Sequence, residues 1–90
     1  MNEQSIHSLL EMKNIGPQLA HDLMSIGIYS LDDMIDLGSV EIVHKLGISD
    51  RSVCYNKLYA IEGAIQGVRW HSLSKQERIR LKSEFDTSVD

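Results

Sequence analysis

The chain of 90 residues carries a formal net charge of −4, a hydrophobic content of 42% and one cysteine. This length predicts a single domain over residues 1–90, the apolar content excludes intrinsic disorder, and the lone cysteine excludes an internal disulfide or a multi-cysteine zinc site. Because no apolar run is long enough to cross a membrane and the first residues do not form a signal peptide, we expect a cytoplasmic protein without a membrane partner.

Apolar residues recur at helical spacing along the whole chain, which predicts an all-α fold of five to six short helices. Ser5 is the expected cap of the first helix, which ends near Met12. After a turn of sequence KNIG, Pro17 opens the second helix, where a missing N–H has no helical partner to lose. Gly27 ends this helix in a left-handed conformation, and Ile28 then makes the hydrophobic contact of a Schellman ending.

Capping residues also predict the third and fourth helices. Ser30 and Asp33 form a capping box for the third helix, which Gly38 ends. Ser39 starts the fourth helix, and Gly47 ends it with a repeat of the Gly-Ile pair that ended the second. The residues expected to face the core are Leu31, Met34 and Ile35 in the third helix and Val40, Val43 and Leu46 in the fourth.

A long central helix begins at Ser49 or Asp50. Small residues recur along it at helical spacing, which lets another helix pack closely against its backbone. These small residues are Ala60, Gly63, Ala64 and Gly67, and the apolar stripe of the same helix comprises Cys54, Leu58, Ile61, Ile65 and Val68. Ser74 and Glu77 form a second capping box, which opens the last helix. The core residues expected in that helix are Ile79, Leu81 and Phe85.

Two helix–turn–helix pairs, over residues 5–26 and 39–66, share one layout with Ile and Gly in the turn. Helix-hairpin-helix modules use the unpaired N–H groups after such a turn to hold a DNA phosphate, so we expect a helix-hairpin-helix or SAM-like arrangement. The candidate phosphate contacts are Lys13, Asn14 and Gly16 in the first turn and Gly47 and Arg51 in the second. The alternative is that the turns only connect packed helices, because residues 1–50 hold two bases against eight acids and Asp50 stands where a phosphate would sit.

Several side chains of the second half are candidates for partner contacts. Trp70 is expected to anchor the last helix on the core, and a position at the centre of a partner interface is the alternative. Glu62 is either a solvated helix charge or the acceptor of a buried hydrogen bond from a neighbouring turn. Three bases share one face of the last helix, which is either a solvated surface or a contact for an acidic partner or for DNA held by a partner. These bases are Lys75, Arg78 and Lys82.

No residue pattern predicts catalysis, a metal or a cofactor. The four histidines lack the helical pairing of a metal site, and Cys54 lies on an apolar stripe, where a cysteine behaves as a small hydrophobe. The aspartates at the start of the third helix do not match a calcium-binding loop. We therefore expect no catalytic residue, no metal ligand and no cofactor, and a protein that is not an enzyme.

Two segments carry a more specific pattern: NIGPQLAHDLMSIGIYSLDDM at residues 14–34 and LYAIEGAIQGVRWHSLS at residues 58–74. With an NIG turn, an IGI ahead of a Ser-capped acidic helix, and a long helix followed by a tryptophan, the chain resembles the C-terminal domain of the TfoX/Sxy family of DNA transformation (competence) regulators. The resemblance covers roughly residues 6–82. The α/β domain that precedes this one in full-length regulators is absent, so we expect either a stand-alone member or an excised domain.

The resemblance implies a non-enzymatic regulatory module that helps to induce competence genes through protein–protein contacts. In this family the implied partner is a transcription factor, the cyclic-AMP receptor protein, bound at promoters. Two alternatives come from other classes: a helix-hairpin-helix module that binds the DNA backbone weakly and non-specifically, and a structural unit for oligomerisation. The partner that is bound and the oligomeric state are left open.

Overall fold

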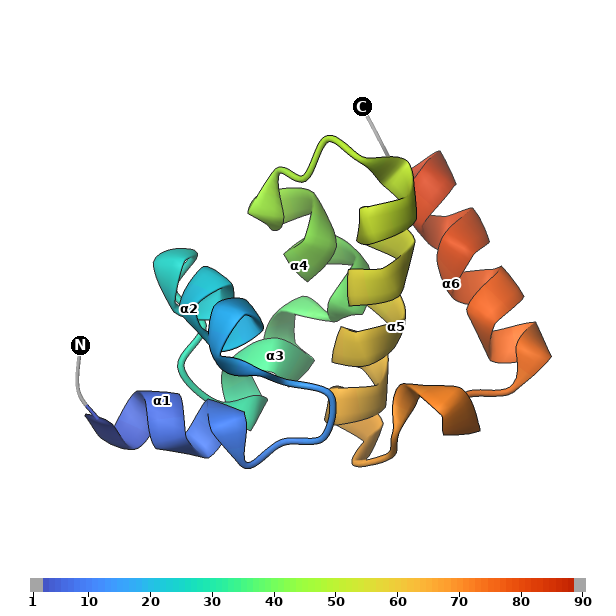
Figure 1. Ribbon diagram of the computed structural model, residues 1–90. Helices are drawn as coiled ribbons and strands as arrows, with labels where there is room; N and C mark the ends of the chain where they lie inside the picture. The colour runs from blue at the N-terminus through green and yellow to red at the C-terminus, as the bar shows by residue number, and fades with distance from the viewer. Residues whose placement is uncertain (1–2, 89–90) are drawn as a thin grey trace.

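Six α-helices and one short 3-10 helix build the computed structural model, which describes residues 3–88, with side chains from Ile6 onward (Figure 1). In chain order they are α1 (Glu3–Leu10), α2 (Pro17–Ser25), α3 (Leu31–Leu37), α4 (Ser39–Leu46), α5 (Arg51–Gln66), η1 (Trp70–Ser72) and α6 (Lys75–Thr87). Residues 3–88 contain no strand, which confirms the all-α prediction.

The predicted start of the first helix is wrong by nearly one turn. Helix α1 begins at Glu3, so Ser5 lies within the helix and does not cap it. Glu3 and Gln4 are good helix formers, and they extend the helix toward the N-terminus past the residue that would have capped it. The helix ends at Leu10, and Met12 N–H closes the following turn by donating to the carbonyl of Leu9.

The other helix ends follow the local signals more closely. Gly27 has a φ of 89°, and the N–H of Ile28 donates to the carbonyl of Leu23 at 3.0 Å, as a Schellman ending requires. The Ser74 hydroxyl and the Glu77 side chain make both hydrogen bonds of a capping box. At α3 the Ser30 hydroxyl accepts from the N–H of Asp33, as in a capping box. The second hydrogen bond of the box is shifted by one residue, because the Asp33 carboxylate accepts from the N–H of Tyr29 and not from that of Ser30.

Helix α5 is the centre of the molecule, as predicted for the long helix. It packs against α3, α4, η1 and α6, and it stands between α6 and the first three helices (Figure 1). Leu58 and Ile61 of this helix are fully buried. The other buried apolar residues are Leu9, Ile15, Leu19, Ala20, Leu23, Met24, Ile28, Met34, Ile42, Val43, Cys54, Ala64, Leu73, Leu81 and Phe85.

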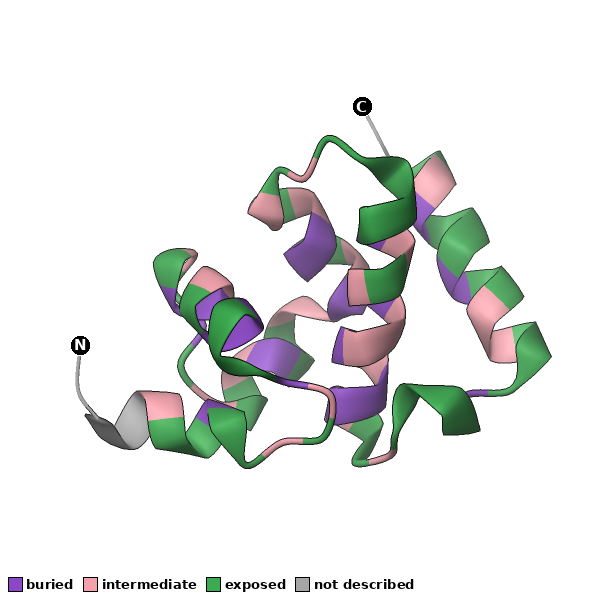
Figure 2. Cartoon of the chain, in the orientation of Figure 1, coloured by how far each residue is buried: buried purple, intermediate pink, exposed green. Residues whose placement is uncertain are grey.

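Three residues expected in the core lie at the surface. The exposed fractions are 39% for Leu31, 54% for Ile35 and 58% for Ile79. Helix α3 has two turns and buries Met34 alone, while α6 packs on α4 and α5 and buries Leu81 and Phe85. Most of α6 is exposed in Figure 2. A helix whose apolar residues lie on more than one side can bury only one of those sides. The periodicity of the sequence alone did not show which side that is. Val40, Leu46, Ile65 and Val68 are half-buried.

Glu62 takes the second of its two predicted roles. The hydroxyl of Ser39, which is 3% exposed at the start of α4, donates to Glu62 Oε1 at 2.7 Å. The side-chain amide of Gln66 donates to Glu62 Oε2 at 2.8 Å. The carboxylate therefore satisfies a buried hydroxyl and joins α5 to the start of α4, where a solvated charge would contact water only.

Candidate binding groove beside the first turn

The α1–α2 turn is held in place by the side chain of Asn14. This residue has a φ of 72°, the left-handed region that asparagine tolerates better than most residues. Its Nδ2 donates to the carbonyl of Ala60 at 3.3 Å and to the carbonyl of Val68 at 3.0 Å. Its Oδ1 accepts from the N–H of Trp70 at 3.1 Å. One amide thus bridges the first turn, the central helix and the segment that follows it, an arrangement we call the Asn14 bridge.

Gly63 provides the space in which this bridge forms. A Cβ atom placed on Gly63 would lie 2.7 Å from Nδ2 of Asn14, 2.8 Å from the carbonyl oxygen of Val68 and 3.3 Å from Cα of Trp70. The sequence predicted that small residues of the central helix admit a neighbouring helix, and that interpretation is wrong for Gly63. The chain itself returns across Gly63 after a left-handed turn at Gly67, whose φ is 76°.

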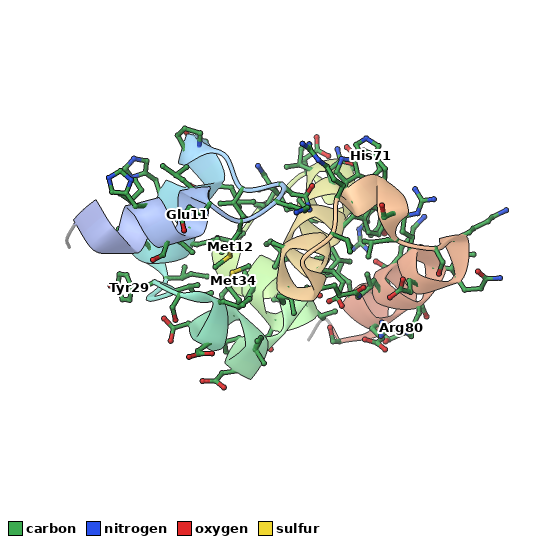
Figure 3. All side chains as sticks on the ribbon, turned by 90° about the horizontal axis from the view of Figure 1, so that it is seen from below. Glu11, Met12, Tyr29, Met34, His71 and Arg80 are labelled. Atoms are coloured by element: carbon green, nitrogen blue, oxygen red, sulfur yellow. The ribbon has the colours of Figure 1, made fainter. Side chains whose placement is uncertain are left out.

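A groove of about 700 Å³ opens next to the Asn14 bridge. One wall is the start of α2, a second is the outer face of α5, and a third is the segment that contains η1. Its lining residues are Asn14, Gly16, Pro17, Gln18, Leu19, Val53, Asn56, Lys57, Tyr59, Ala60, Arg69, Trp70 and His71. Figure 3 places His71 at the edge of the molecule, on the side away from Tyr29.

The groove is a positive region of an acidic chain. None of its lining residues is an aspartate or a glutamate, while Lys57 and Arg69 both contribute to it. Neither base forms an ion pair with a side chain of residues 6–88, among which the ion pairs are Arg51–Asp86 and Arg80–Glu84. Sequence reasoning missed Lys57 and Arg69. The available signal was their position, one turn before Ala60 on the central helix and directly before Trp70.

The two turns that share a sequence layout differ chemically in the structure. At the second turn the Asp50 carboxylate caps α5 by accepting from the hydroxyl of Ser52 and from the N–H groups of Val53 and Ser52. These hydrogen bonds, led by that of the Ser52 hydroxyl, lower the pKa of Asp50 below its ordinary value, so the cap is anionic. Arg51 pairs with Asp86 at 2.7 Å.

The first turn has no such anionic cap. The residue before α2 is Gly16, no side chain caps this helix, and Pro17 is its first residue. Both amide hydrogens of Asn14 are engaged inside the protein, while Lys13 is exposed. Phosphate binding by Lys13, Asn14, Gly16, Gly47 and Arg51 stays a prediction.

Trp70 lies in the groove and outside the core. Its exposed fraction is 38%, so the expectation that it anchors the last helix in the core is wrong. Leu73, which is 2% exposed, fills that position three residues later. The indole ring stacks on the ring of His71 with 4.0 Å between the ring centroids. Trp70 therefore remains available as a partner contact.

The three bases predicted on α6 do not line the groove. Lys75 and Lys82 are exposed and Arg78 is half-buried. The ammonium group of Lys82 lies 4.8 Å from the centroid of the Tyr55 ring, a cation–π contact with α5. The α6 bases are therefore separate from the groove, and their role as a partner contact stays a prediction.

The side chains of Cys54 and His44 pack against other parts of the fold. Cys54 is buried, burial raises the pKa of its thiol, and its Sγ donates to the carbonyl of Ile48 at 3.4 Å. His44 stacks on Phe85 with 4.2 Å between the ring centroids. Within the described part of the chain, no group of three His, Cys, Asp or Glu side chains is placed to hold a metal ion. No helix there is long and apolar enough to span a membrane.

Truncating Trp70 to alanine is expected to lower the free energy of unfolding by about 2 kcal/mol, less than the loss at a fully buried tryptophan, because more than a third of the residue is already in water. The N–H of residue 70 still donates to Asn14 in this variant. Urea unfolding of both proteins measures the difference. A loss above about 3 kcal/mol would return Trp70 to the core.

Comparison with known proteins agrees with this architecture. The model of the TfoX C-terminal domain family matches residues 5–85. A triclinic crystal structure of an uncharacterized protein from Listeria monocytogenes is similar to the chain with 42% identity and a TM-score of 0.77, over 88% of this chain and 90% of that one. A tetragonal crystal structure of a Listeria monocytogenes protein of unknown function has 41% identity and a TM-score of 0.76, over 91% of this chain and 100% of that one. No curated protein matches the chain.

Proposed function

Because the chain belongs to the TfoX C-terminal domain family, we propose that it is a non-enzymatic regulatory module that acts in the cytoplasm through protein–protein contacts. The process it serves is the induction of competence genes, as the resemblance to TfoX/Sxy regulators implies. Its partner is a transcription factor such as the cyclic-AMP receptor protein. In this view the domain contributes a docking surface and no chemistry of its own.

The groove is the observation that carries this proposal. Interfaces between proteins concentrate tryptophan, tyrosine and arginine near their centres, and the groove brings together Trp70, Tyr59 and Arg69. The basic surface of Lys75, Arg78 and Lys82 supplies a second contact, which steers an acidic partner toward the domain.

The test is association of the purified domain with the purified cyclic-AMP receptor protein, measured by sedimentation or by biolayer interferometry. We expect a complex that forms without DNA and weakens as salt is raised, because exposed charges steer the encounter. A reversal of charge at Arg78 and Lys82 should slow association. Absence of any complex, with and without promoter DNA, would contradict the proposed partner.

The second candidate function is non-specific binding of the DNA backbone at the first turn. The observation that favours it is the uncapped start of α2 beside the exposed Lys13. Two features disfavour DNA binding: the net charge of −4, and the absence of lysine and arginine from α2.

We expect the isolated domain to bind duplex DNA with a Kd of about 10⁻⁴ M or weaker at physiological salt, because few phosphates can be neutralised. Fluorescence anisotropy with a labelled duplex measures this at two salt concentrations, and Lys13→Ala reports whether the first turn contributes. Sequence-specific binding with a Kd below about 1 μM would instead make DNA the principal ligand.

A further inference from the structure

We propose that the groove between α2, α5 and residues 69–71 is a docking site for an acidic peptide segment that also inserts one large apolar side chain. This inference rests on the proposed function, since it assigns that function to one surface and states the chemistry of the partner.

Charge selects an acidic occupant. The chain as a whole is acidic, yet no carboxylate lines the groove, and its lining residues Lys57 and Arg69 have no ion-pair partner among the side chains of residues 6–88. A carboxylate that meets Arg69 forms charge-assisted hydrogen bonds, which are shorter and stronger than neutral ones. The uncapped start of α2 adds a positive dipole end to the same space.

Shape selects a peptide. The volume of about 700 Å³ holds a few side chains of a partner, and apolar groups of Pro17, Val53, Tyr59 and Trp70 form much of the lining. A large aliphatic or aromatic side chain placed there loses contact with water against these surfaces. A DNA duplex needs phosphate contacts along two strands. Two basic side chains in a concave site supply too few of these contacts.

The groove is built before its occupant arrives. The Asn14 bridge joins the turn before α2 to α5 and to Trp70, so all three walls are held by the same amide. Gly63 lets the third wall lie against α5. A site with fixed walls loses little conformational entropy when it binds, which favours a short segment that contributes few contacts.

The experiment uses the fluorescence of Trp70, which is the single tryptophan of the chain and lies in the groove. The probe is a short synthetic peptide in which glutamates flank one leucine, and the matched probes replace every glutamate with glutamine or with lysine. We expect a saturable change in Trp70 emission with the glutamate peptide, and affinity at least about tenfold lower for the other two.

A matched pair of variants tests the location. Arg69→Glu reverses an exposed base in the groove, and Lys45→Glu makes the same charge change at an exposed position of α4 that does not line it. We expect Arg69→Glu to weaken peptide binding by about tenfold or more and Lys45→Glu by less than about twofold, with similar urea unfolding midpoints for both. Equal effects of the two variants, or equal binding of the glutamate and glutamine peptides, would overturn the proposal.

Tighter binding of a single-stranded oligonucleotide than of the glutamate peptide would also overturn it, because aromatic rings beside bases are used to bind single strands. The groove and the proposed function can fail separately. Peptide binding that Arg69→Glu abolishes would support the groove even if the cyclic-AMP receptor protein does not bind. A complex with that protein that is insensitive to Arg69→Glu, together with no peptide binding, would overturn the groove alone.

Discussion

Replacing Asn14 with alanine is expected to destabilise the domain by about 2 to 4 kcal/mol. The change removes the donor for the carbonyls of Ala60 and Val68 and the acceptor for the N–H of Trp70. Partly buried groups that lose their partner incur a desolvation penalty larger than the net value of the bond itself. Alanine also tolerates a φ of 72° less well than asparagine.

Urea unfolding of three variants separates these causes. Asn14→Gly relieves the backbone and loses the same hydrogen bonds, so it should be about 1 kcal/mol less damaging than Asn14→Ala. Asn14→Asp keeps an acceptor for Trp70 N–H and places a charged carboxylate against the carbonyls of Ala60 and Val68, so it should remain strongly destabilised. A loss below about 1 kcal/mol for all three would show that the bridge is not a significant source of stability.

Replacing Gly63 with alanine is expected to lower the free energy of unfolding by about 2 to 3 kcal/mol, although alanine is normally more favourable than glycine inside a helix. The added Cβ would lie 2.8 Å from the carbonyl oxygen of Val68, which is backbone, as well as 2.7 Å from the Asn14 amide. A side-chain end can move aside, whereas the carbonyl of Val68 moves only with the turn after α5. The returning chain must therefore shift away from the helix.

Gly16→Ala is the control for this variant. A Cβ on Gly16 has no atom within 4 Å and its φ is −94°, so its effect should stay below about 1 kcal/mol, which reflects the lower preference of a helix N-cap for alanine. Thermal or urea unfolding of both variants measures the contrast. The double variant Asn14→Ala with Gly63→Ala should lose less stability than the two single variants combined. Without the Asn14 amide, the added Cβ on residue 63 is too close only to the carbonyl oxygen of Val68. A stabilising Gly63→Ala would contradict the close approach itself.

The predictable parts of this fold were local in sequence. The stop at Gly27 and the box at Ser74 depend on residues within one turn, and at these two ends the local signal placed the helix boundary correctly. The facing of α3 and α6 was less predictable, because Ile35 and Ile79 are apolar residues on helices too short or too polar to define one buried side. Which side of each helix is buried is determined by its packing against α4 and α5.

Some residues of the candidate site could be singled out from the sequence, but their relation to one another could not. The sequence singled out Asn14, Gly63 and Trp70, and it assigned them to a phosphate contact, a helix contact, and either the core or a partner interface. Their actual relation is a set of contacts between positions more than 40 residues apart, for which no spacing rule exists. At the second turn the sequence already placed Asp50 where a phosphate would sit, and the structure shows that its carboxylate caps α5.

The span of the Asn14 bridge has a kinetic meaning. Its hydrogen bond to Val68 joins positions 54 residues apart, so it closes a loop that takes in most of the chain. Contacts of such sequence separation form after the local ones and add little to the speed of folding. An interaction absent from the folding transition state acts instead on the unfolding rate, which it slows. We therefore expect the bridge to slow unfolding, and so to lengthen the lifetime of the folded domain and of the groove whose walls it joins.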